Sequence, residues 1–551
     1  MQRAILAIFF SAAVIAGAWR FVDLSRDPDD ITQTSQDAWG DPAVYLYNAR
    51  SFALFREWRT GEGVAMFVTP GYSFLAAFWF SLFGASYLSA VKLSTLAGFV
   101  VVAGTAAFAG VTFENAHWKA GRRCAAAAAI SLLCSYVLFV HQHIPVGDME
   151  ALAVSTLAAL GMALLQTIDP MRFPGRFRLV ATLAGLGIAL APFMKLHNGI
   201  FSAAAVAAWI SSGMVLGPEW KTRRRQATPW LAAGLALAAA LLLVWAAWLY
   251  AEASPEEIAR QVSRLRAFSV TTAQPELKDY DPKAAFAFTR YFRTNLLYRQ
   301  PVETALALLG LIGFIGGRRR EWPLYLASVW WVVAVAALSS MGTDALRYRL
   351  IAWPAVVVLA ANVWERFYEA AFEPLTGYAR LSLAAGSGLV FGSLGVYLAA
   401  AKTRATPPAT VEFLFFAGAA LLGYAAVLLM AKLPQKPVAL VLAVLMLSVD
   451  FPQWVIGERR VSHDLLEVSR ELEKFSAAEY LVSGGWGVRL ALPTGRNAYL
   501  GAPRSPLPQI MVIDEVVREN SPKGLEVERH RMKKYPLELV FIRIDPESKL
   551  K

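Results

Sequence analysis

The stretch Pro229–Tyr250, PWLAAGLALAAALLLVWAAWLY, decides the class of fold. It carries no charged side chain, and it matches the ~20 apolar residues that a helix needs to cross a bilayer core. Because the bilayer interior offers no water to backbone polar groups, a single segment crosses it as a helix. The stretch therefore predicts a membrane-spanning helix.

The rest of the chain has the same character. Of its 551 residues, 56% are hydrophobic and 17% are charged, whereas soluble domains are ~25% charged. The mean hydropathy is +0.44. The first apolar run also fits a cleaved signal peptide, since Ala16-Gly17-Ala18 resembles a cleavage site. Reading that run as a span, we expect about thirteen transmembrane helices, near residues 4–19, 88–112, 124–142, 149–168, 179–194, 198–215, 229–250, 301–316, 323–340, 350–364, 381–400, 412–431 and 437–455.

A formal net charge of +12 raises nucleic acid as a partner. The basic residues, however, fall in short clusters between apolar runs, around Arg122, Arg176, Arg224 and Arg319. Such clusters are typical of cytoplasmic loops under the positive-inside rule. We therefore expect membrane lipids, and no nucleic acid, as partners.

The aromatic stretch from Pro70 to Gly84 decides on which face these clusters lie. If it crossed the membrane, the four clusters would lie outside, and if it lies in the interface, all four lie inside. We therefore expect an interfacial helix at 70–84. Residues 20–87 then form a first outer loop, and residues 251–300 form a long outer loop.

Charged residues become frequent after residue 455. The helical pattern SHDLLEVSRELEKF is followed by strand patterns near AEYLVS, QIMVID and LELVFIRI. We predict a membrane domain over 1–455 and a small soluble, extracytoplasmic α/β domain over 456–551. The expected fold class is an all-α polytopic membrane domain with interfacial helices and this C-terminal α/β domain.

Cysteine and histidine do not form a recognisable metal pattern. Cys124 and Cys134 lie in one apolar run, about 15 Å apart along a helix, which is too far for a disulfide. His141, His143 and His197 fall at outer span ends, where we expect ordinary polar helix termini. We assign no metal ligand.

Ionisable side chains gather at the outer ends of the expected spans, where burial of charge is expensive. They are Asp41, Asp148, Glu150, Lys195 and Arg347. Structural roles are open alternatives: Asp41 and Asp148 could cap the helices that follow them, and Lys195 and Arg347 could extend from span ends to the interface. The gathering on one face is the strongest functional signal in the residues themselves.

Carboxylates beside cations at a lipid–water boundary suit a definite reaction. When a sugar leaves a lipid phosphate, a Lys or Arg neutralises the charge that gathers on the phosphate. The acceptor hydroxyl loses its proton as it attacks, so a carboxylate within reach serves as general base. The bilayer holds the donor head group at a fixed depth.

The order of these motifs resembles the GT-C glycosyltransferases of the protein O-mannosyltransferase and aminoarabinose (lipid A) transferase type. Those enzymes carry an Asp before a Tyr and an Ala-Arg helix, then a Pro-containing segment that leads into an aromatic interfacial helix. Pro42 departs from the pattern, because many of these enzymes have a second acidic residue there. The matching residues are Asp41, Tyr45, Ala49 and Arg50, then TPGYSFLAAFWFSLFGAS from Thr69, then Asp148, Lys195, Arg347, Tyr348 and Pro354.

The resemblance implies a GT-C-like membrane fold and a polyprenyl-phosphate-linked sugar as donor. It implies Asp41 as the general base, Asp148 as a second catalytic carboxylate that orients substrate, and Lys195 and Arg347 near the donor phosphate. The remaining members of the expected substrate-binding set are Tyr45, Glu150 and Tyr348.

We therefore predict a glycosyltransferase that moves a sugar to an acceptor hydroxyl on the extracytoplasmic face of a bacterial inner membrane. The sugar, the acceptor (protein, lipid or glycan), the oligomeric state and a divalent cation as cofactor stay open. The alternatives are a transporter or flippase for lipid-linked glycans, which would need charges along a path through the bilayer, and a membrane scaffold. The transferase requires Asp41, Asp148, Lys195 and Arg347 to converge on one outer cavity.

Overall fold

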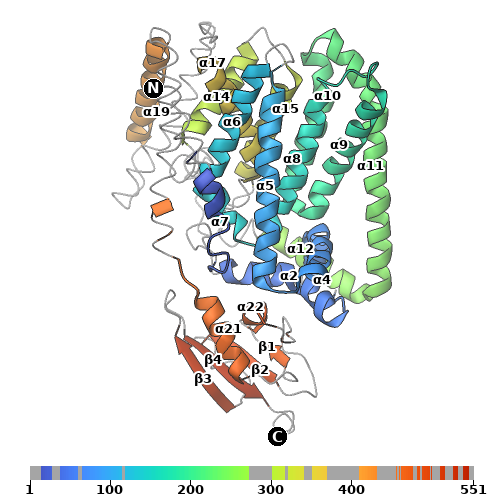
Figure 1. The fold of residues 1–551 in the computed structure, drawn as a ribbon, viewed down its shortest axis with the longest axis vertical. Coiled ribbons are helices and arrows are strands. Elements are labelled where there is room, and N and C mark those ends of the chain that lie inside the picture. The colour runs from blue at the N-terminus through green and yellow to red at the C-terminus, as the bar shows by residue number, and fades with distance from the viewer. Residues whose placement is uncertain are drawn as a thin grey trace.

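The computed structural model of the chain is a bundle of helices with a small sheet beyond one end (Figure 1). It describes residues 11, 14–27, 37–59, 65–113, 118–271, 301–316, 321–340, 350–368, 409–430, 454–455, 458, 461–475, 481–483, 487–494, 496, 498, 509–514, 525–531 and 538–544. The predicted spans at 381–400 and 437–455 lie outside these ranges, apart from residues 454–455.

Four of the described segments are long and apolar enough to cross a membrane. They are α5 (Tyr87–Val111), α9 (Pro174–Met194), α10 (Gly199–Val215) with the preceding 3-10 turn η3 (Leu196–Asn198), and α11 (Pro218–Glu252). Only 17% of the most apolar window of α11 is buried, so most of that helix surface is available to lipid. The chain is an integral membrane protein.

The span predicted at 124–142 is broken into two helices. α6 (Trp118–Cys134) and α7 (Tyr136–Gln142) are bent by 64° at Ser135. The Ser135 backbone is extended, and its hydroxyl caps α7 by accepting a hydrogen bond from the Leu138 backbone N–H at 3.4 Å. The prediction of one continuous helix is wrong, because a cap inside an apolar run leaves no mark on hydropathy. If the pair is one broken span, the described spans number five.

Five further described helices match predicted spans within a few residues. The total of about thirteen stays a prediction. These helices are α8 (Asp148–Leu164), α14 (Pro301–Gly316), α15 (Trp322–Ser340), α17 (Trp353–Tyr368, after the 3-10 turn η4, Leu350–Ala352) and α19 (Ala409–Met430).

Small residues let neighbouring helices of the bundle approach closely. A Cβ at Gly185 of α9 would lie 2.1 Å from the backbone oxygen of Leu231 in α11. A Cβ at Gly234 of α11 would lie 2.0 Å from the backbone oxygen of Thr182. These two helices therefore cross with their backbones in contact, which any larger residue would prevent.

The described part of the first predicted outer loop contains three helices: α2 (Asp37–Phe55), α3 (Ala65–Val68) and α4 (Pro70–Phe83). In Figure 1, α2 and α4 lie at the end of the bundle where α5 begins. α4 has 14 residues, about 21 Å of helix, which is shorter than a ~30 Å bilayer core. This length agrees with the interfacial helix predicted at 70–84.

The second predicted outer loop, 251–300, contains a helix. α12 (Pro255–Thr271) starts with a capping box, in which the Glu257 N–H donates to Ser254 Oγ at 3.2 Å and the Ser254 N–H donates to Glu257 Oε2 at 3.0 Å. Two acidic residues in its first turn also favour the helix N-terminus. Residues 272–300 lie outside the described ranges.

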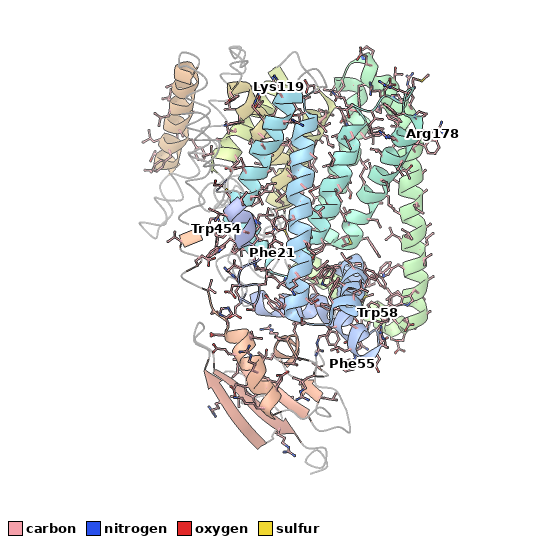
Figure 2. All side chains as sticks on the ribbon, in the orientation of Figure 1. Phe21, Phe55, Trp58, Lys119, Arg178 and Trp454 are labelled. Atoms are coloured by element: carbon pink, nitrogen blue, oxygen red, sulfur yellow. The ribbon has the colours of Figure 1, made fainter. Side chains whose placement is uncertain are left out.

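The described basic clusters and the aromatic residues of the first predicted outer loop lie at opposite ends of the bundle. Figure 2 places Lys119 and Arg178 at one end and Trp58 and Phe55 at the other. At the basic end, Arg223 of α11 donates hydrogen bonds to backbone carbonyls that follow α8. This separation is the arrangement that the positive-inside rule requires.

The C-terminal region contains a four-stranded sheet of order β1-β2-β4-β3. β1 and β2 are parallel, and the other two pairs are antiparallel. The predicted helix and three strands are found, whereas β3 was missed because its sequence, LEVERHR, is too charged for a strand pattern. The elements are α21 (Asp464–Phe475), β1 (Leu481–Ser483), α22 (Gly487–Ala491), β2 (Gln509–Asp514), β3 (Leu525–Arg531) and β4 (Glu538–Ile544).

The start of this region is attached to the residues that follow the first apolar run. Arg26 Nη1 lies 2.8 Å from Glu458 Oε1, and His463 Nε2 lies 2.7 Å from Asp23 Oδ1. Trp454, labelled in Figure 2 beside α7, donates its indole N–H to the Cys134 carbonyl at 2.8 Å. The C-terminal region therefore stays close to the end of the bundle that carries α2 and α4.

Candidate functional site

Asp148 is the first residue of α8, and 4% of it is exposed. Gly147 precedes it with φ 80°, a conformation that favours glycine, and a Cβ there would lie 2.9 Å from the Tyr72 ring. The N-cap position belongs to Gly147, so the alternative in which Asp148 caps the helix is wrong. The N-terminus of α8 nevertheless stabilises the negative charge of the Asp148 carboxylate.

Lys195 follows the last residue of α9 and contacts Asp148 directly. Its ammonium lies 2.7 Å from Asp148 Oδ1 and donates to the Val146 carbonyl at 2.8 Å. It also lies 4.8 Å from the ring centre of Tyr45 in α2, in a cation–π contact. Only 1% of Lys195 is exposed, so it does not extend to the interface. Three predicted site residues from α2, α8 and the end of α9 thus meet.

His197 joins this group, although sequence reasoning treated it as an ordinary polar terminus. Its Nε2 lies 3.3 Å from Asp148 Oδ1, the oxygen that also faces Lys195. The 3-10 turn η3 directs both side chains toward one carboxylate. The signal in the sequence was a Lys and a His two residues apart in KLHN, opposite a predicted carboxylate.

Glu150 lies two residues after Asp148 in a buried polar layer. Its Oε1 accepts a hydrogen bond from Ser94 Oγ of α5 at 2.7 Å, and only 3% of Glu150 is exposed. Tyr72 of α4 is fully buried beside this layer; burial raises its pKa well above the usual value, and the charge of Glu150 raises it further. Tyr72 therefore remains a neutral phenol. Sequence reasoning assigned no role to Ser94 or Tyr72.

Asp41 lies within α2, which begins at Asp37, so it is not the N-cap of a helix that opens with Pro42. It precedes Tyr45 by four residues, which puts the two positions one turn apart on the same helix face. Tyr45 contacts Lys195, so the backbone brings the Asp41 position toward the Asp148–Lys195 pair. The other two predicted site residues, Arg347 and Tyr348, lie outside the described residues.

His141 and His143 make the contacts expected of helix-terminal residues. In each, Nδ1 lies 2.8 Å from the backbone carbonyl four residues earlier. Burial lowers the pKa of His143 to about 4, so this imidazole is neutral at pH 7. Within the described ranges, no three His, Cys, Asp or Glu side chains are grouped so that they could hold a metal ion.

Comparison with known proteins gives matches of structure alone. No family model matches the chain, and no curated protein sequence matches it. The structure is similar to that of ArnT from Cupriavidus metallidurans bound to undecaprenyl phosphate, with 14% identity, 98% of each chain covered and a TM-score of 0.53. For apo ArnT the identity is 16%, the coverage 99% of each chain and the TM-score 0.53. The apo oligosaccharyltransferase of Archaeoglobus fulgidus matches 91% of this chain and 65% of its own, with 14% identity and a TM-score of 0.47.

The ArnT match covers nearly the whole of both chains, including the C-terminal region. At this identity it establishes a shared fold. The predicted resemblance to GT-C glycosyltransferases of the aminoarabinose transferase type is therefore confirmed at the level of the fold.

Proposed function

We propose that the chain is a membrane glycosyltransferase that moves a sugar from a polyprenyl-phosphate donor to an acceptor hydroxyl. One observation carries the proposal: a buried Asp148–Lys195–His197 group lies beside α2 in a fold shared with ArnT, which was solved with undecaprenyl phosphate. A polyprenyl-phosphate donor and an acceptor protein, lipid or glycan would be the partners.

The proposed reaction is a single displacement. The acceptor oxygen attacks the anomeric carbon while Asp41 takes the hydroxyl proton as general base. The bond between the anomeric carbon and the phosphate oxygen breaks, and the electron pair leaves with the polyprenyl phosphate. The configuration at the anomeric carbon is inverted. The position of Asp41 one turn before Tyr45 supports this role, because Tyr45 contacts Lys195.

The charges near the site suggest how the leaving phosphate is stabilised. Lys195 and Asp148 form a neutral pair at 2.7 Å, so together they bring no net positive charge. We assign the excess positive charge to Arg347, with Lys195 acting through its field and holding Asp148 in place to orient substrate. Tyr45, Glu150 and Tyr348 complete the proposed substrate-binding set.

Lys195 follows the last residue of α9, whose first turn carries Arg176 and Arg178, so the site lies at the end of the bundle opposite these two basic residues. With the basic loops in the cytoplasm, the site and the region 456–551 would be extracytoplasmic. We propose the bacterial inner membrane as the location, residues 1–455 as the membrane domain and residues 456–551 as a small soluble domain.

The test is mass spectrometry of glycolipids, glycans and glycoproteins from cells with and without the protein. Cells with the wild-type chain should contain a glycosylated product that is missing in cells without it, and in cells with Asp41→Asn at equal membrane abundance. Asp169→Asn, in an exposed turn at the basic end, is the matched control and should leave the product unchanged. Redistribution of a lipid-linked glycan without a new glycosidic bond would instead identify a transporter.

A further inference from the structure

Side chains of α2, and of the segment after it, bind backbone carbonyls of the C-terminal region. Arg50 Nη2 donates to the Thr494 carbonyl at 2.9 Å and also to the Arg496 carbonyl. Tyr47 Oη donates to the Ala498 carbonyl at 3.2 Å, and Arg59 Nη1 donates to the same carbonyl at 2.8 Å. All four bonds join parts of the chain more than 400 residues apart.

We call these three acceptor residues, Thr494, Arg496 and Ala498, together with the preceding Leu492, the strap. The strap is attached to the sheet, because Ala498 forms a parallel bridge with Val482 of β1. It is also attached to the bundle end, because Leu492 is 2% exposed and packs in an apolar cluster with α2 and α4 side chains. Apolar packing and hydrogen bonds thus both join the strap to the end of the bundle that carries α2.

The buried charge of Arg50 strengthens the contact between α2 and the strap. Arg50 is 2% exposed. Burial and then the charge of Arg59 lower its pKa to about 10, so it stays charged at pH 7. Among the described residues, its hydrogen-bond acceptors are the two strap carbonyls. A charge buried without acceptors is strongly unfavourable, and the two strap carbonyls supply acceptors for the buried Arg50 guanidinium.

The geometry of α2 connects the strap to the site. Arg50 follows Tyr45 by five residues, about 140° around the helix. The face with Tyr45 therefore meets Lys195, and the nearly opposite face meets the strap. α2 is thus held on two faces, and the backbone of Asp41 belongs to the same helix.

We propose that the strap is a structural part of the transferase site and that Arg50 is the positioning residue through which it holds α2. The proposal rests on the proposed function, because the residue that it places is the general base Asp41. In this proposal the C-terminal region has a specific role: it holds the proposed general base in position at the sugar-transfer site.

The test compares Arg50→Ala, Arg50→Lys and the matched control Arg56→Ala in the full-length protein in lipid nanodiscs. Arg56 is exposed in the same segment. Hydrogen–deuterium exchange is measured on peptides covering α2, the strap and, as a folding control, α5. Transfer is measured in cells by the glycan product. For Arg50→Ala we expect the exchange rates in α2 and the strap to rise about tenfold or more, while exchange in α5 stays unchanged. The amount of glycan product should fall by a similar factor. Arg50→Lys should restore part of the protection from exchange and part of the product, and Arg56→Ala should match the wild type in both measurements.

Each other outcome has a definite meaning. If α5 also loses protection in Arg50→Ala, that variant is misfolded, and the same measurements on Tyr47→Phe, which removes one hydroxyl, decide instead. Unchanged exchange in Arg50→Ala would overturn the docking. Faster exchange with undiminished product would overturn the positioning role and leave the proposed function intact. If the wild type forms no product, the proposed function fails, while the exchange data still decide whether the strap holds α2.

Discussion

Replacing Lys195 with Met should destabilise the protein strongly, because the change removes the ammonium that pairs with the buried Asp148 carboxylate. Met keeps the length of the side chain and removes the charge. The lost contacts include the 2.7 Å ion pair, the 2.8 Å bond to the Val146 carbonyl and the cation–π contact with Tyr45. The side chains of Lys195 and Asp148 are only 1% and 3% exposed, so solvent screens the pair little.

The expected magnitude follows from this burial. Removing one partner of a buried ion pair costs about 3–5 kcal/mol. His197, 3.3 Å from the same carboxylate, recovers part of this when protonated, so we expect about 3 kcal/mol. Asp148→Asn should also destabilise, and the double variant should be at least about 1.5 kcal/mol more stable than the sum of the two single changes predicts.

The measurement is equilibrium unfolding in mixed micelles, monitored by circular dichroism, for the four proteins of this cycle. Lys92→Met is the control: Lys92 is exposed on α5, and its loss should cost less than about 0.5 kcal/mol. Additive single changes, or equal effects of Lys195→Met and Lys92→Met, would refute a coupled buried pair at the centre of the site.

Three further outcomes are expected. Gly147→Ala should lower the unfolding midpoint more than Gly84→Ala, because both glycines have positive φ but only at Gly147 would the Cβ overlap a neighbouring ring; equal midpoints would show that the turn relaxes. Acidification from pH 7 to 5 should remove roughly 2 kcal/mol from the free energy of unfolding through His143. Burial lowers the folded-state pKa of His143 to about 4, so the unfolded chain binds the proton more readily. Thermal scans of His143→Gln at the two pH values should lack this contribution of His143 to the loss. Glu365→Gln should lower the free energy of unfolding by about 1–2 kcal/mol, which is less than for Lys195→Met. The reason is that its partner Arg123 is 32% exposed, although Glu365 itself is fully buried. A larger loss for Glu365→Gln than for Lys195→Met in the same unfolding assay would contradict this ranking by burial.

The candidate site was only partly predictable. Asp148, Lys195 and Glu150 stood out because ionisable side chains at span ends are conspicuous, whereas Tyr45 was expected only from the family resemblance. The structure brings Asp148, Lys195 and Tyr45 together, while their catalytic and binding roles stay predictions. His197 was missed because its partner Asp148 is far along the chain, and its spacing from Lys195 in KLHN was the one signal that could have indicated this contact.

Local sequence determined the helices and most of the small sheet. An apolar run such as Pro229–Tyr250 must satisfy its own backbone hydrogen bonds in lipid, and only a helix does so within one segment. The amphipathic pattern of α21 and the short apolar run of β2 have the same local origin. Tertiary structure decided what depends on contacts between distant segments: the break at Ser135, the charged strand β3, the Lys195–Asp148 pair and the strap on Arg50. Their energy comes from burial and charge pairing across the fold, which neither hydropathy nor spacing along the chain records.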